Sequence, residues 1–127
     1  MAKILFNEAT KEFHLQNDRI SYIFCIMENG QLGHQYFGKH LTHRDPFQHF
    51  IQMRTQSHTA YVYENDFLFT LDTIRQEYPS YGTTDFREPA YQIKQENGSR
   101  ITEFVYKNHE IYKGKKKLKG LPATYTE

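Results

Sequence analysis

The sequence has no tryptophan and only one cysteine, Cys25, in 127 residues. A single cysteine cannot form a disulfide within the chain or a zinc site built from several cysteines, and it fits a reducing compartment. An excess of charge of one sign is also missing, because 16 lysine and arginine residues face 15 aspartate and glutamate residues, for a net charge of +1. So small a net charge creates no field that would attract nucleic acid or an anionic membrane. We therefore expect a cytoplasmic protein with no nucleic-acid partner.

Long apolar runs are absent as well. The longest covers residues 20–27 and is interrupted by Ser21, whereas a helix that spans a membrane needs roughly 18 apolar residues. The first residues, MAKILFNEATKEF, carry charge and lack the apolar stretch and cleavage site of a signal peptide. We expect no membrane partner and no export.

Aromatic residues are abundant. Ten tyrosines and ten phenylalanines accompany a hydrophobic content of only 38%, and their large rings carry enough buriable area for a core. The length suits one domain rather than two. The sequence therefore predicts that residues 1–127 form a single domain.

Turn signals divide the chain into short strands. Asn29-Gly30 and Asn97-Gly98 each predict a hairpin with a two-residue loop. The resulting registers pair Met27 with Leu32 and Ile23 with Tyr36 in the first hairpin, and Gln95 with Arg100 and Tyr91 with Phe104 in the second. Because apolar residues alternate on both faces of the first hairpin, we expect its strands to be covered on both sides.

Two more hairpins are predicted, one pairing residues 3–6 with 12–16 and one pairing 60–63 with 67–71. Asp45-Pro46 predicts an N-cap that starts a short helix, and residues 71–77 predict another helical turn. Many short strands with so little helix indicate an all-β fold, an antiparallel β-sandwich.

Two groups of residues suggest chemistry. His40, His43, Asp45 and His49 lie close together in the sequence, but the H-E-x-x-H motif of zinc proteases is missing, and we expect no metal and no cofactor. The predicted register places His34 opposite Cys25, as a nucleophile and base would lie. The alternative reading is that Cys25 is a small buried hydrophobic residue in an apolar strand, and this reading is favoured.

The segment YPSYGTTDFREPA, residues 78–90, combines residues that restrict the backbone. Asp85 and Arg87, two apart on extended chain, point to one side, where they can pair with each other or reach across an interface. We interpret this segment as a rigid structural motif, whose members are Tyr78, Pro79, Gly82, Asp85 and Arg87.

Longer stretches resemble a known family. QEYPSYGTTDFREPA at residues 76–90 and GLPATYTE at residues 120–127, together with KILFNEATKEFHLQND near the start, are similar to the N-terminal domain of bacterial family 36 α-galactosidases. The resemblance runs nearly from end to end and is weakest over residues 42–65. Residues 123–125 look like the start of a strand, so the chain is expected to be a piece of a longer polypeptide.

The resemblance implies an enzyme of several domains. Its N-terminal β-supersandwich precedes a barrel with two catalytic aspartates, which retain configuration through a covalent glycosyl intermediate. Neither catalytic motif is present in this chain, so no catalytic residue is expected here and the chain alone should be inactive. The expected substrates of the parent enzyme are oligosaccharides with terminal α-linked galactose, such as melibiose and raffinose.

The resemblance also implies a homo-oligomer, with a tetramer expected, in which loops of this domain reach a neighbouring subunit's substrate pocket. Arg44, Arg54 and Asp66 are the candidate substrate-binding residues, because they carry the groups that sugar hydroxyls need. The alternative is a stand-alone carbohydrate-binding module without catalysis. A domain cut from a larger sandwich should also leave apolar side chains exposed.

Overall fold

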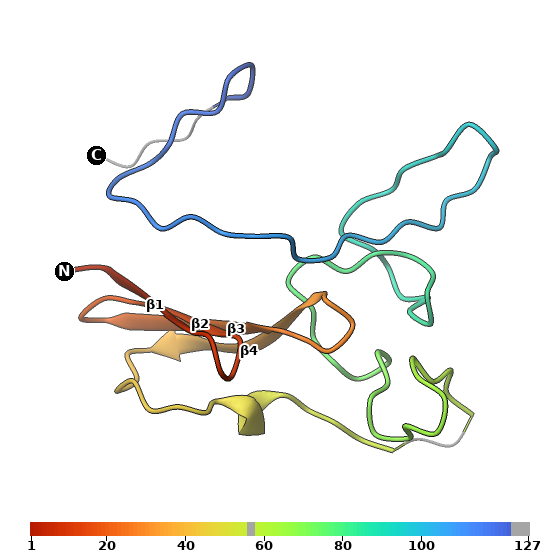
Figure 1. Ribbon diagram of the computed structural model, residues 1–127, viewed down its shortest axis with the longest axis horizontal. Coiled ribbons are helices and arrows are strands. Elements are labelled where there is room, and N and C mark those ends of the chain that lie inside the picture. The colour runs from red at the N-terminus through yellow and green to blue at the C-terminus, as the bar shows by residue number, and fades with distance from the viewer. Residues whose placement is uncertain (56–57, 123–127) are drawn as a thin grey trace.

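A computed structural model describes residues 1–55 and 58–122. Its regular part is one antiparallel sheet, in which the strands lie in chain order (Figure 1). The strands are β1 (Lys3–Asn7), β2 (Glu12–Gln16), β3 (Ile20–Ile26) and β4 (Leu32–Lys39), followed by one 3-10 turn, η1 (Gln48–Phe50). The predicted all-β fold class and the pairing of the first two strands are confirmed. Over the described residues, no helix has the length and apolarity to cross a membrane.

The loop between β3 and β4 has three residues, not the predicted two. Met27 N donates to Gln31 O at 2.8 Å and Gly30 N donates to Met27 O at 2.9 Å, with Gly30 at a φ of 80°. In this type of hairpin the last loop residue has a left-handed backbone conformation, which glycine adopts without strain. Ile26 rather than Met27 therefore faces Leu32.

A bulge next to Ile23 restores the expected register farther from the turn. Ile23 faces Tyr36 as predicted, because β4 contains one extra residue between the partners of Ile23 and Phe24. Between the bulge and the turn the register is shifted, so Cys25 faces Gly33 and the predicted opposition of Cys25 and His34 is wrong.

The second Asn-Gly turn has the same local structure. Gln95 N donates to Ser99 O at 2.9 Å, so the loop again has three residues and Ser99 replaces Arg100 as the partner. The described residues 91–106 form no strand, although the rings of Tyr91 and Phe104 stack with centroids 4.6 Å apart, as their predicted pairing requires. Residues 60–71 likewise form no strand.

Both helix predictions are wrong in detail. The turn η1 begins at Gln48 after Phe47, which makes no side-chain capping bond, so Asp45 is not an N-cap. Residues 71–77 form no helix. Instead, residues 75–77 pair with the outer edge of β4, where His34 N donates to Arg75 O at 2.8 Å and Glu77 N donates to Leu32 O at 2.9 Å.

Both faces of the hairpin are covered, as expected. On one face, Cys25 and Met27 form a core with Phe69, Leu71 and Ile74. On the other, the ring of Phe13 stacks on Phe24, with centroids 4.8 Å apart, and meets His109 edge-on at 4.8 Å. Residues near 70 and near 109 thus sandwich the sheet, although they form no second regular sheet within the described residues.

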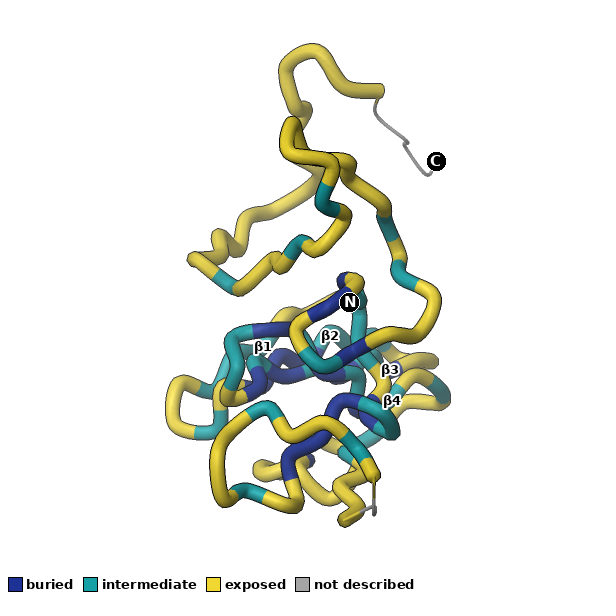
Figure 2. Tube along the Cα trace, turned by 90° about the vertical axis from the view of Figure 1, so that its right-hand side faces the viewer, coloured by how far each residue is buried: buried dark blue, intermediate teal, exposed yellow. Residues whose placement is uncertain are grey.

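Residues 91–122 form two long loops that extend away from the sheet, joined by a segment near Tyr106 and His109 that lies against it (Figures 1 and 2). Most of their length is exposed in Figure 2, and large apolar side chains are exposed along it: Ile93, Ile101, Phe104, Val105, Ile111, Leu118 and Leu121. The apolar surface expected of a domain cut from a larger protein is therefore present. The strand predicted at residues 123–125 lies outside the described residues.

Candidate functional site

A cleft of about 520 Å³ lies beside the edge strand β4. Three segments form it: β4 itself, the chain that leaves η1, and the segment paired with the strand edge. Phe47 N donates to the buried carboxylate of Glu12 at 2.8 Å, which fixes the start of the second segment against the sheet. The lining residues are His34, Gln35, His49, Phe50, Ile51, Gln52, Met53, Arg54 and Arg75.

Two arginines give the cleft its charge. Arg54 is oriented by Gln52, whose amide oxygen, when turned toward it, accepts from Nε at 3.1 Å and from Nη2 at 2.6 Å. The backbone of Arg75 is fixed by its hydrogen bond to His34. None of the residues lining the cleft is acidic, and within the described residues neither guanidinium forms an ion pair.

His34, at the wall of the cleft, belongs to a small polar chain. Its Nδ1 lies 2.6 Å from Glu77 Oε1, and the Tyr22 hydroxyl donates to Oε2 of the same carboxylate. Burial, and then the hydrogen bond to Glu77, raise the pKa of Tyr22 well above its usual value. The Tyr22 hydroxyl therefore stays protonated and holds Glu77 in place.

The cleft has the groups of a binding site rather than those of a glycosidase centre. Guanidiniums, imidazoles and amides can hold polar ligands, and Phe50 supplies a half-exposed ring. Hydrolysis with retention needs two carboxylates about 5 Å apart. None of five clefts in the described part of the chain is lined by two acidic residues.

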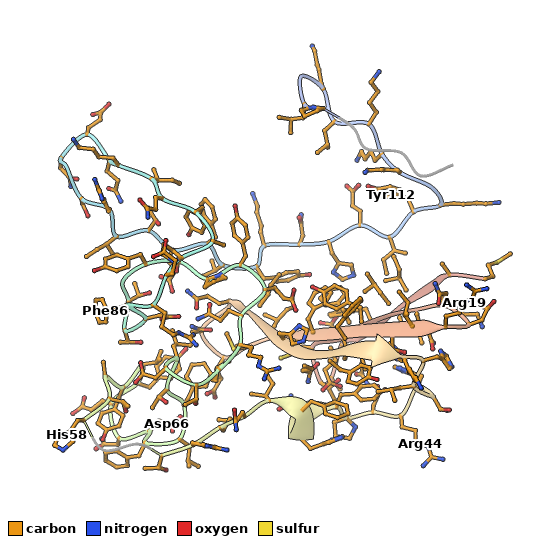
Figure 3. The ribbon with its side chains drawn as sticks, turned by 180° about the vertical axis from the view of Figure 1, so that it is seen from behind. Arg19, Arg44, His58, Asp66, Phe86 and Tyr112 are labelled. Atoms are coloured by element: carbon orange, nitrogen blue, oxygen red, sulfur yellow. The ribbon has the colours of Figure 1, made fainter. Side chains whose placement is uncertain are left out.

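The three predicted sugar-binding residues are not brought together. Only Arg54 lines the cleft. Arg44 and Asp66 lie at opposite sides of the molecule in Figure 3, and Arg44 is exposed. Asp66 closes a turn, because its Oδ1 accepts from Leu68 N at 2.9 Å and from Phe69 N at 3.1 Å.

The predicted structural motif is held by an ion pair. The Asp85 side chain is 2% exposed, and its two oxygens accept from Arg87 Nε and Nη2, each at 2.9 Å. Gln76 Nε2 donates to the same carboxylate at 2.9 Å, and Arg87 Nη2 also donates to Ile74 O at 2.9 Å. The hydrogen bonds that Arg87 donates to the Asp85 carboxylate raise the pKa of Arg87. Asp85 and Arg87 therefore pair with each other, which is the first of the two predicted alternatives.

A tight turn presents Asp85 to this pair. Gly82 and Asp85 exchange both backbone hydrogen bonds, and the intervening Thr83 and Thr84 have φ values of 51° and 77°. A Cβ on Gly82, whose φ is 97°, would lie 2.7 Å from a methyl carbon of Ile101. Glycine is therefore required here by both backbone and space.

The other two members close the motif. The Tyr78 ring stacks on Tyr91, with centroids 4.9 Å apart and planes at 14°, and the carbonyl of Pro79 accepts from Ala90 N at 2.9 Å. The segment from Tyr78 to Ala90 is thus a closed loop with its ends joined.

A second polar chain escaped the sequence analysis. His14 Nδ1 lies 2.9 Å from His43 Nδ1, His14 Nε2 lies 2.8 Å from the Ser21 hydroxyl, and His43 Nε2 lies 3.2 Å from Asp45. Burial, and then the charge of His43, lower the pKa of His14. His14 and His43 are far apart in the sequence, and no motif links them. Within the described residues, no three His, Cys, Asp or Glu side chains are placed to hold a metal ion.

Cys25 is a core residue. It is 2% exposed, and burial, with a smaller effect of Glu12, raises the pKa of its thiol to about 12. A thiol with so high a pKa forms no nucleophilic thiolate at neutral pH. The favoured interpretation, a small buried hydrophobic residue, is confirmed.

Known proteins resemble the chain over almost its whole length. The alpha-galactosidase AgaA of Geobacillus stearothermophilus is 44% identical over 98% of this chain, and Mel36A of Lactobacillus acidophilus is 33% identical over 98%. This chain covers only 17% of either relative.

Solved structures agree with the sequence relatives. The crystal structure of the alpha-galactosidase from Lactobacillus brevis superimposes on 94% of this chain with a TM-score of 0.84 at 41% identity. AgaA in complex with raffinose superimposes on 92% with a TM-score of 0.79 at 44% identity. In each case this chain covers 16% of the solved chain.

The family itself is identified by a model of the glycosyl hydrolase family 36 N-terminal domain, which matches residues 30–127. The match includes the closed loop around Asp85 and all the residues that line the cleft beside β4. The chain therefore belongs to glycosyl hydrolase family 36, as an N-terminal domain of that family.

Proposed function

We propose that this chain is the non-catalytic N-terminal domain of an α-galactosidase that releases terminal α-linked galactose from oligosaccharides of the melibiose and raffinose type. The observation that carries the proposal is the similarity to α-galactosidases along nearly the whole chain. The chain itself covers only about a sixth of the length of those relatives. None of the five clefts in the described residues is lined by two carboxylates, which supports a non-catalytic role for this part.

Within the parent enzyme, the domain serves as scaffold and subunit interface of a homo-oligomer, with a tetramer proposed. The exposed apolar side chains of residues 91–122 support a role in contacts with other parts of the protein. Arg44, Arg54 and Asp66 are proposed to face a neighbouring subunit's substrate. Arg54 has the strongest support, because it lines a cleft. The proposed location is the cytoplasm.

Hydrolysis of a chromogenic α-galactoside tests the proposal. The 127-residue chain is compared with the parent protein, read from the same gene to its natural stop codon. Activity of the parent alone supports the proposal, whereas activity of the chain alone contradicts it. Light scattering on the parent gives the number of subunits, and cell fractionation gives its location.

The second candidate, a stand-alone carbohydrate-binding module, is favoured by one observation. The rings of Tyr78, Tyr91 and Phe104 lie nearly parallel in one cluster, and Tyr78 and Phe104 are each 52% exposed, as a platform for a sugar ring would be. An inactive parent together with raffinose binding by the chain would support this candidate instead.

A further inference from the structure

The cleft beside β4 has an excess of positive charge that nothing in the described structure neutralises. Arg54 and Arg75 come from separate segments, and neither forms an ion pair among the described residues. Glu77, behind the wall, is already bound to His34 and Tyr22, and Glu88, which lines a second cleft with Arg75, forms no ion pair with it among the described residues. Two guanidinium-bearing residues that line one cleft without a counter-ion add to its positive potential, which favours an anionic ligand there.

The geometry of guanidinium groups favours phosphate over a single carboxylate. Each guanidinium can donate two parallel hydrogen bonds, and a carboxylate satisfies only one such fork. A phosphate group has three terminal oxygens and nearly two negative charges near neutral pH, so it can accept from both arginines at once. Gln52 already holds the Nε side of Arg54, which leaves its Nη1 to face a ligand.

The rest of the lining suits a polyhydroxylated ligand. His49 and Phe50 place two rings 4.3 Å apart at one wall, and Gln52 supplies an amide beside them. Rings and amides of this kind contact the apolar faces and hydroxyls of sugars. A volume of about 520 Å³ accommodates a monosaccharide with one phosphate group.

We infer that the cleft formed by β4, residues 48–54 and Arg75 binds a small sugar phosphate. Arg54 and Arg75 hold the phosphate, and Phe50 and Gln52 hold the sugar. The uncharged oligosaccharides of the proposed reaction carry no phosphate, so for Arg54 the sugar phosphate is an alternative ligand to a neighbouring subunit's oligosaccharide, and the inference does not require hydrolysis by the parent enzyme.

Isothermal titration calorimetry of the parent protein and of the 127-residue chain with galactose 6-phosphate tests the inference. The comparison ligands are galactose and inorganic phosphate. The variants are Arg75→Gln and the double variant Arg54→Gln/Arg75→Gln. Arg19→Gln is the matched control, since Arg19 is exposed and is not among the residues that line the cleft. Circular dichroism confirms that each variant is folded.

We expect saturable binding of galactose 6-phosphate that weakens with added salt, and weaker binding of either comparison ligand. Loss of one charge-assisted contact should weaken binding about tenfold or more, and the double variant should lose it, while Arg19→Gln binds as the unchanged protein does. The inference is overturned by equal binding of inorganic phosphate, by binding that survives the double variant, or by no binding in the parent protein. Because the readout is binding heat, failure of the α-galactosidase assay leaves the test intact.

Discussion

The pair of Asp85 and Arg87 should dominate the stability of the closed loop at residues 78–90. The perturbation is Asp85→Asn, which keeps the shape of the side chain and removes its charge. Each carboxylate oxygen accepts two hydrogen bonds: Oδ1 from Arg87 N and Nε, and Oδ2 from Gln76 Nε2 and Arg87 Nη2. Whichever oxygen becomes an amide nitrogen, two donors then face another donor.

The magnitude follows from those two lost bonds. Each hydrogen bond to a charged group contributes about 1.5–3 kcal/mol when buried. The Arg87 side chain is 41% exposed, so water replaces part of what it loses, and the sum must be discounted. We expect Asp85→Asn to lower the free energy of unfolding by about 2–3 kcal/mol, a large share of the 5–15 kcal/mol typical of a domain.

Urea unfolding of the 127-residue chain, followed by circular dichroism and extrapolated to zero urea, measures this change. Arg87→Gln and the double variant complete a thermodynamic cycle, in which the two residues should couple by at least about 1 kcal/mol. Glu103→Gln, at an exposed position, serves as the control and should leave the midpoint nearly unchanged. An effect of Asp85→Asn no larger than that of the control, or additive single effects, would refute the reasoning.

Four further outcomes are expected. Burial lowers the pKa of His14, so neutral His14 stabilises the fold above the unfolded pKa of 6.5, and this stabilisation is lost as the pH falls from 6.5 through the folded pKa. Melting temperatures measured at several pH values should fall over this range, and the fall should be smaller in His14→Gln. The Cys25 thiol, with its pKa raised to about 12, should react with an aromatic disulfide reagent at pH 8 only after unfolding, and rapid labelling of the native chain would contradict its burial. Gly82→Ala should lower the free energy of unfolding by about 2 kcal/mol or more, measured by urea unfolding, whereas Gly98→Ala, with no atom near the new methyl group, should cost less. The isolated chain should bind a hydrophobic dye or dimerise in light scattering, and a dye-silent monomer would count against an interface role for residues 91–122.

Short-range sequence patterns predicted the first strands and the positions of the turns, which depend on neighbouring residues. Turn residues and strand propensity predicted β1 and β2 nearly to the residue, and Asn-Gly marked both turns. The extra loop residue was missed, because the two-residue and three-residue hairpins share the Asn-Gly signal and differ in where the glycine lies. The bulge that compensates for it has no signal in the sequence at all.

The same distinction applies to the side-chain clusters. Asp85 and Arg87 could be predicted to meet, because residues two apart on extended chain share a side. Arg54 and Arg75 share a cleft only because residues 75–77 pair with β4, where a helix had been expected. His14 meets His43 for a similar reason, since the chain after β4 turns back across β2. Contacts of this kind depend on tertiary packing.

The chain order of the strands has a consequence for synthesis on the ribosome. Each of the four strands pairs with its neighbour in sequence, so the first 39 residues contain all the pairings between these strands, and only the backbone pairing of residues 75–77 with the edge of β4 comes later. The segments that cover its two faces, near residues 70 and 109, emerge later, after roughly 2–14 seconds at ordinary translation rates of about 5–20 residues per second. During that interval the young sheet presents two uncovered apolar faces, which makes this stage the one at which a nascent-chain chaperone would be needed.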